Sequence, residues 1–131
     1  VEDAAEAIGA KFDGKFLGNH GVVGCFSFNG NKTITTGSGG MIVTNSKKIA
    51  KKVKLLRSHG ITKQKEDFTK DMSKLSNLGM WHYEMQVLGF NYRANNLSIA
   101  LGLSQLDKLS RFVKNRRSHQ SHLKELFFPT L

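Results

Sequence analysis

The sequence contains one cysteine, one proline and no long apolar run. A single thiol, Cys25, cannot form an internal disulfide, which favours a reducing compartment. The cytoplasm is therefore the expected location. No apolar stretch approaches the roughly 20 residues that a helix needs to cross a bilayer, so no membrane-spanning segment and no membrane partner are predicted.

Motifs of several other function classes are also missing. No Walker or Rossmann glycine fingerprint is present, because the glycines near residue 40 do not lead into a helix. The histidines show no spacing with Cys25 or with acidic residues that is typical of zinc. No metal site is predicted. The five histidines are His20, His59, His82, His119 and His122.

Acidic residues are few, with 10 Asp and Glu against 20 Lys and Arg and a net charge of +10. Such an excess can indicate a nucleic-acid or anionic-membrane partner, and a basic binding module without catalysis is the alternative function. The basic residues gather in segments 47–57 and 108–124, which also suit solvated helix faces. A cluster of aromatic residues lies near Trp81 and Phe90 and does not interleave with the basic runs, which disfavours a nucleic-acid stacking platform. Nucleic acid is therefore not an expected partner.

The hydrophobic pattern predicts an α/β chain, with strands in the first half alternating with helices. Strands are expected at 22–28 and 41–44, a hairpin at 11–16 around Asp-Gly, and a long loop with one helical turn at 61–79. Helices are expected at 3–8, ended by Gly9; at 47–57, capped at 45–46; from Asn95 or Asn96 to 109; and at 109–126.

The stretch Gly24–Gly40 organises the chain. Two short apolar runs flank a polar connection that is rich in threonine and glycine and carries Lys32. A lysine between strand ends suits covalent chemistry with an aldehyde. The alternative is that Lys32 is one more basic residue in an exposed hairpin loop.

Residues 27–40, Ser-Phe-Asn-Gly-Asn-Lys-Thr-Ile-Thr-Thr-Gly-Ser-Gly-Gly, resemble the S-F-x-x-x-K-x-x-T-T-G-E-G-G signature of DegT/DnrJ/StrS-type sugar aminotransferases. Segments 2–10, 88–93 and 100–106 resemble that family's E-D-A-A, L-G-F-N-Y-R and A-L-G-L-x-Q-L segments, in the same order. The resemblance implies the aspartate aminotransferase-like fold, with a three-layer, mostly parallel sheet. Residues 1–107 would be part of its large, pyridoxal 5'-phosphate (PLP) domain. Residues 108–131 would be a helix leading toward a small domain.

The resemblance also implies roles for residues near the cofactor. Lys32 would bind the PLP aldehyde covalently and then carry a proton, and Asp3 would hold the ring nitrogen. Ser27 would contact the phosphate, and Glu6 stands where the family has His or Gln near the phenolic oxygen. Without the family resemblance, Asp3 would be interpreted as a helix N-cap, and a serine in a strand such as Ser27 would indicate no function.

Asn91 and Arg93 match a segment that reaches the neighbouring subunit's site in family dimers, near the cofactor phosphate. Arg is the better anion partner by charge and geometry, while on their own the two suit a surface turn. The Trp-His-Tyr-Glu segment at 81–84 resembles the branch that makes a 4-amino sugar precursor of pseudaminic acid.

The implied activity is transfer of an amino group from glutamate to a 4-keto nucleotide sugar, a UDP-4-keto-6-deoxy-HexNAc, by a homodimer. Three departures from the family pattern are Glu6, Ser38 in place of Glu, and Ala-Asn-Asn at 94–96. The chain begins and ends inside the family pattern. It is therefore expected to be a fragment that is inactive and self-associating by itself.

Overall fold

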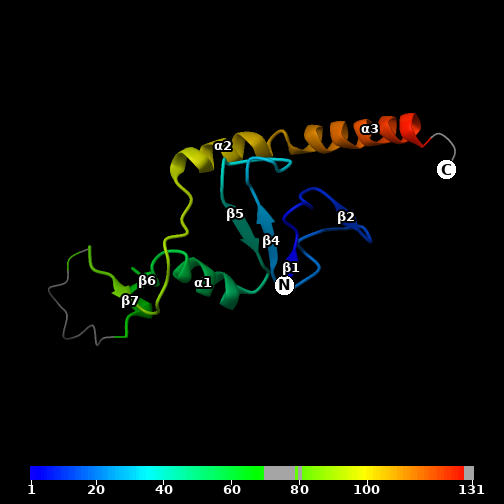
Figure 1. Cartoon of the computed structure of the whole chain (residues 1–131). Coiled ribbons are helices and arrows are strands. Elements are labelled where there is room, and N and C mark those ends of the chain that lie inside the picture. The colour runs from blue at the N-terminus through cyan, green and yellow to red at the C-terminus, as the bar shows by residue number, and fades with distance from the viewer. Residues whose placement is uncertain (70–78, 80, 129–131) are drawn as a thin grey trace. The chain divides into compact units, whose positions relative to one another are not determined.

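A computed structural model describes residues 1–69, 79 and 81–128. They form two compact units, described separately below (Figure 1). The first unit comprises Val1–Asn45 with Ala94–Leu131, and the second comprises Ser46–Arg93. The later part of the loop expected at 61–79 lies outside the described residues. The expected division at residue 107 stays a prediction.

The first unit contains a three-stranded sheet in the order β1-β4-β5. Its strands are β1 (Glu2–Asp3), β4 (Gly24–Ser27) and β5 (Gly40–Val43). β1 runs parallel to β4, and β4 runs antiparallel to β5, which Figure 1 shows as neighbouring arrows. The two strands expected from the apolar runs are confirmed; β4 is shorter than the expected 22–28, and β5 begins and ends one residue before the expected 41–44. One pair is parallel and the other is a hairpin that carries the Lys32 loop.

The helix expected at 3–8 is wrong. Glu2 and Asp3 belong to β1, and two tight turns follow, closed by Ala7 N–H to Ala4 C=O and Ala10 N–H to Ala7 C=O, each at 3.0 Å. Six residues give too few i to i−4 hydrogen bonds to offset the cost of helix nucleation. The pairing of β1 with β4 takes the first two residues instead.

A hairpin follows, as the Asp-Gly signal predicted. β2 (Lys11–Phe12) pairs antiparallel with β3 (Lys15–Phe16). Between them Asp13 has φ 48° and Gly14 has φ 72°. Two positive φ values in a two-residue connection define the turn that matches the twist of a hairpin. The hairpin prediction is confirmed.

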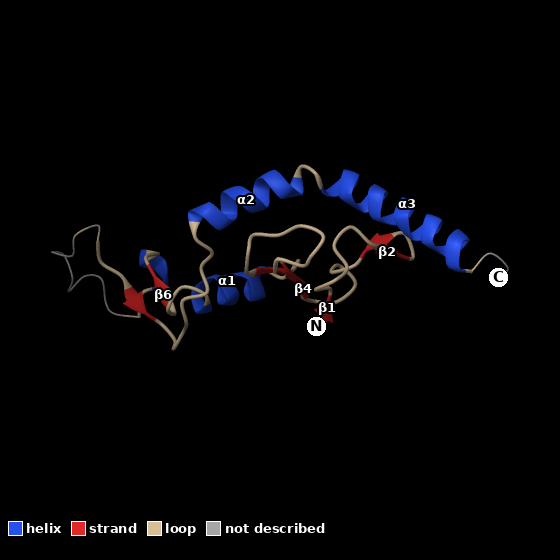
Figure 2. Cartoon of the chain, turned by 45° about the horizontal axis from the view of Figure 1, so that its top comes forward, coloured by secondary structure: helices blue, strands red, loops and turns tan. Residues whose placement is uncertain are grey.

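The two C-terminal helices are confirmed and drawn in blue in Figure 2. α2 (Asn96–Leu106) begins at Asn95, whose side chain accepts a 2.8 Å hydrogen bond from the Ser98 N–H. α3 spans Leu109–Phe127. The apolar positions of α2 face solvent in this unit, with Leu97 85% exposed. Among the described residues, only Ala4 and Ile34 are buried apolar side chains.

The second unit is built around α1 (Lys47–Leu56), which is capped by Ser46 and confirms the expected helix. β6 (Ile61–Thr62) pairs antiparallel with β7 (Glu84–Met85). The loop expected from residue 61 therefore starts as a short strand, because a sequence-distant partner supplies its hydrogen bonds. The expected helical turn is the 3-10 helix η1 (Lys65–Asp67).

Candidate functional site

Four of the six predicted site residues, Asp3, Glu6, Ser27 and Lys32, lie in the first unit, on β1, on β4 or on the segments that follow these strands. β1 and β4 are parallel, so their carboxyl ends lie at the same edge, where ligands of α/β sheets commonly bind. The turn after β1 carries Glu6, and the loop after β4 carries Lys32. The Lys32 ammonium forms an ion pair with the Glu6 carboxylate across 26 positions of sequence. Topology alone therefore brings these two predicted residues together.

The loop that carries Lys32 is held by hydrogen bonds at both ends. Phe28 donates its N–H to Gly39 C=O at 2.9 Å, and its own C=O accepts from Thr36 N–H and from Thr35 Oγ1, each at 3.0 Å. Within the loop, Ile34 is buried, at 3% exposure. These hydrogen bonds fix the conformation of the loop between β4 and β5, which is therefore not a flexible hairpin loop.

Lys32 is not an ordinary surface lysine. Its side chain is 13% exposed, whereas a lysine on a solvated loop keeps its charged head in water. Its backbone N–H donates to Asn29 C=O at 3.1 Å, which closes a turn just before it. The alternative of an exposed hairpin lysine does not fit this placement.

Asp3 and Ser27 lie on one face of the sheet. Asp3 is in register with Cys25, and Ser27 follows two positions later on β4, so all three side chains share a face. Asp3 Oδ1 accepts a hydrogen bond from the Ala5 N–H at 3.1 Å, which orients the carboxylate. A carboxylate and a hydroxyl thus lie on adjacent strands that lead to the Glu6–Lys32 pair.

Glu2 was not predicted as a functional residue. It precedes Asp3 on β1, so its side chain lies on the opposite face of the sheet. Its carboxylate accepts backbone N–H groups from Gly18, from His20 at 2.9 Å and from Gly21 at 3.1 Å. These donors, the Gly18 N–H first and the Gly21 N–H next, lower the pKa of Glu2, while burial opposes them. No local pattern indicates this contact, because its partners are 16 to 19 residues away.

Asn91 and Arg93 belong to the second unit, and both are exposed. Asn91 forms an isolated antiparallel bridge with Ser58, and the Tyr92 N–H donates to Arg57 C=O at 2.9 Å. The aromatic rings of Phe90 and Tyr92 stack with centroids 5.4 Å apart. Backbone pairing therefore holds the segment along the end of α1.

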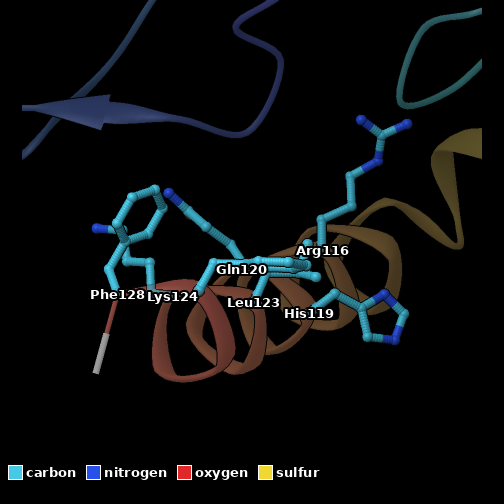
Figure 3. A pocket seen from close by; sticks show the side chains of 7 residues that line it. Arg116, His119, Gln120, Leu123, Lys124 and Phe128 are labelled. Atoms are coloured by element: carbon cyan, nitrogen blue, oxygen red, sulfur yellow. The ribbon is translucent and has the colours of Figure 1, made fainter.

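Two hollows lie away from the Glu6–Lys32 pair. One runs along a single face of α3 and is lined by residues of that helix and its end, as Figure 3 shows. Another, in the second unit, is lined by lysines of α1 together with Glu66 and Asp67, and Lys51 pairs with Asp67. Its lining carries four lysines against two acidic residues, and the basic-module alternative stays a hypothesis. Residues 1–69, 79 and 81–128 contain no group of three or more side chains suited to a metal ion.

None of the described helices has the length and apolar character to cross a membrane.

Comparisons with known proteins identify the family and the fold. The model of the DegT/DnrJ/EryC1/StrS aminotransferase family matches residues 1–128. GDP-perosamine synthase of Escherichia coli O157:H7 is 38% identical over 117 residues, which is 89% of this chain and 28% of that protein. The chain thus spans little more than a quarter of the length of the curated relatives it matches.

Two solved structures share the fold. Helicobacter pylori PseC, an aminotransferase involved in the biosynthesis of pseudoaminic acid, superposes with a TM-score of 0.81 at 32% identity, over 98% of this chain and 31% of that one. The E. coli GDP-4-keto-6-deoxy-D-mannose-3-dehydratase with bound hydrated PLP gives a TM-score of 0.80 at 30% identity, over 95% and 32%. The expected aspartate aminotransferase-like α/β fold is confirmed. The chain belongs to the DegT/DnrJ/EryC1/StrS aminotransferase family.

Proposed function

We propose that this chain is part of a PLP-dependent aminotransferase that moves an amino group from glutamate to a 4-keto nucleotide sugar. The observation that carries the proposal is the placement of Lys32. It is little exposed, on an anchored loop at the carboxyl ends of two parallel strands, beside the turn that follows Asp3. The PLP in a solved relative supports the choice of cofactor.

The residues present fit the needs of PLP. The cofactor requires an amine for its aldehyde, an acid for its ring nitrogen and donors for its phosphate. Lys32, Asp3 and Ser27 supply an amine, a carboxylate and a hydroxyl on neighbouring segments of one unit. When bound, PLP supplies an electron sink for the carbon that loses its proton.

Each residue then has a defined task. Lys32 Nζ would hold the cofactor aldehyde and would accept and return the proton of the reacting carbon. The Asp3 carboxylate, oriented by the Ala5 N–H, keeps the ring nitrogen protonated. The Ser27 hydroxyl donates to a phosphate oxygen. The limited exposure of Lys32 keeps water away from the nitrogen that carries the proton.

Asn91 and Arg93 would complete the site of a neighbouring subunit in a homodimer. Both side chains are exposed, and the pairing of their segment with residues 57–58 fixes the direction in which it presents them. A guanidinium matches a phosphate in charge and geometry. In this proposal Arg93 contacts the cofactor phosphate of the other subunit and Asn91 supports it. A cytoplasmic location fits this enzyme.

The proposed sugar substrate is a UDP-4-keto-6-deoxy-HexNAc, which would place the enzyme in surface-glycan or pseudaminic acid biosynthesis. The similarity to PseC and the segment at 81–84 support this choice. The similarity to GDP-perosamine synthase points to a GDP-linked 4-keto sugar as the competing substrate. A dehydratase activity is disfavoured, because Lys32 is present to hold the aldehyde.

The test is an amino-transfer assay on a protein that carries this chain, with glutamate as donor and each 4-keto nucleotide sugar as acceptor. We expect 2-oxoglutarate and a 4-amino sugar from the UDP-linked acceptor, at a kcat/KM at least tenfold above that with the GDP-linked one. Lys32→Ala should abolish turnover, whereas Lys51→Ala, which removes an exposed lysine of α1, should not. A Lys32→Ala variant with full activity would overturn the proposal.

A further inference from the structure

The two side chains of the Lys32–Glu6 ion pair differ in how much of their surface is exposed to solvent. The Lys32 side chain is 13% exposed, whereas the Glu6 side chain is 75% exposed. Glu6 therefore approaches a sheltered ammonium from the solvent side and can swing away at little cost. The family pattern has His or Gln at the position of Glu6, near the phenolic oxygen of the cofactor, and in this structure the Glu6 carboxylate pairs with Lys32.

This pairing competes with the proposed chemistry at the same atom. The Nζ of Lys32 must lose a proton and offer its lone pair before it can attack an aldehyde carbon. A carboxylate in contact with Nζ occupies the approach to that nitrogen. The ion pair must therefore open before a new bond to Nζ can form.

We propose that Glu6 gates Lys32. It holds the ammonium in the cofactor-free protein and releases it when the cofactor enters, so that Lys32 reacts more slowly with aldehydes and other electrophiles than an unpaired lysine in the same place. The part of this inference that concerns the cofactor rests on the proposed function. Glu6 acts through Lys32 and is a positioning residue.

The expected effect is modest. An ion pair with one solvent-exposed partner is typically weak, and its removal corresponds to a rate increase of about two- to fivefold at Lys32. Glu6→Gln keeps the size of the side chain and removes its charge. Because Glu6 is largely exposed, the variant should keep the melting temperature of the parent.

The experiment has two readouts, neither of which is enzyme activity. The cofactor-free chain is pulsed with acetic anhydride, and acetylation of each lysine is followed by peptide mass spectrometry. In parallel, PLP is added, borohydride is used to fix it at successive times, and its attachment to Lys32 is counted. Both rates at Lys32 should rise about two- to fivefold in Glu6→Gln.

A matched control is available in the second unit. Lys51 pairs with Asp67, and there the lysine is the exposed partner, at 69%. Asp67→Asn should leave the acetylation rate of Lys32 unchanged. An equal change at Lys32 in Asp67→Asn and Glu6→Gln would show a general effect of charge and would overturn the gate.

The outcomes separate the two proposals. If Lys32 is acetylated at an equal or lower rate in Glu6→Gln than in the parent, the proposed role of Glu6 is wrong, regardless of the rate at which PLP attaches. If Lys32 is acetylated faster in Glu6→Gln but PLP attaches to Lys32 in neither the parent nor the variant, Glu6 does slow the reactions of Lys32, and the proposed function is contradicted. Attachment of PLP at equal rates in both proteins leaves the proposed function standing and overturns the gate.

Discussion

A methyl group at Gly24 should disrupt the strand pair on which the proposed site is built. A Cβ at this buried position would lie 2.1 Å from the Gly18 carbonyl oxygen, where contacts under 3.0 Å essentially never occur. The two groups would have to separate by about 0.9 Å, the difference between these distances. Gly18 is not free to move, because its N–H donates to Glu2 and the Phe26 ring lies against it. Overpacking of this kind costs about 1–3 kcal/mol.

For a chain of this length, that cost lowers the melting temperature by about 3–12 °C. The assay is thermal unfolding of the Gly24→Ala variant followed by circular dichroism. Gly30→Ala is the matched control, because a Cβ there meets nothing within 4 Å and its φ is negative. It should change the stability by less than about 0.5 kcal/mol. Melting temperatures that agree between the two variants would refute the reasoning.

Three further predictions concern the supports around the site. Backbone N–H groups of loop 18–21 hold the pKa of Glu2 in the folded protein below its ordinary value of 4.5. The ionised carboxylate therefore stabilises the fold above pH 4.5, and this contribution is lost as the pH falls through the lower pKa of the folded state. The melting temperatures of the parent and Glu2→Gln should therefore converge as the pH falls below 4.5, and a constant difference down to about pH 2.5 would contradict this. Gly60→Ala places a Cβ 1.7 Å from the Val87 carbonyl oxygen at a φ of +67°, so urea unfolding should show a loss of at least about 1 kcal/mol, and an unchanged midpoint would be evidence against the contact. Asn95→Ala removes the cap of α2 and should cost about 1 kcal/mol, read from the same denaturation curve, whereas Asn95→Asp should retain most of the stability.

Features with local causes could be predicted from the sequence. Asp13-Gly14 gave the hairpin, and Ser46 and Asn95 marked the starts of α1 and α2, because turns and caps depend on neighbouring residues. The helix expected at 3–8 was wrong for the opposite reason. Pairing of Glu2 and Asp3 with a strand about 20 residues away overrides a short run of alanines.

The sequence motif named residues for the candidate site, but it could not predict the contacts between them. The motif identified Lys32, Asp3, Glu6 and Ser27, and the parallel pairing of β1 with β4 accounts for their common location. The ion pair between Glu6 and Lys32 could not be predicted, because it depends on how two separate connections approach each other. The hydrogen bonds between the Glu2 carboxylate and the backbone of loop 18–21 could not be predicted for the same reason. The roles of these residues toward the cofactor stay predictions.

The most direct measurement for the central claim is a map of where PLP attaches. The purified chain is incubated with limiting PLP, reduced with borohydride and digested, and the modified peptides are quantified by mass spectrometry. If Lys32 is the cofactor lysine, most of the added mass should fall on the peptide that contains it, a visible absorbance should precede reduction, and Lys32→Ala should lose both. PLP spread over the exposed lysines of α1, with none at Lys32, would contradict the account.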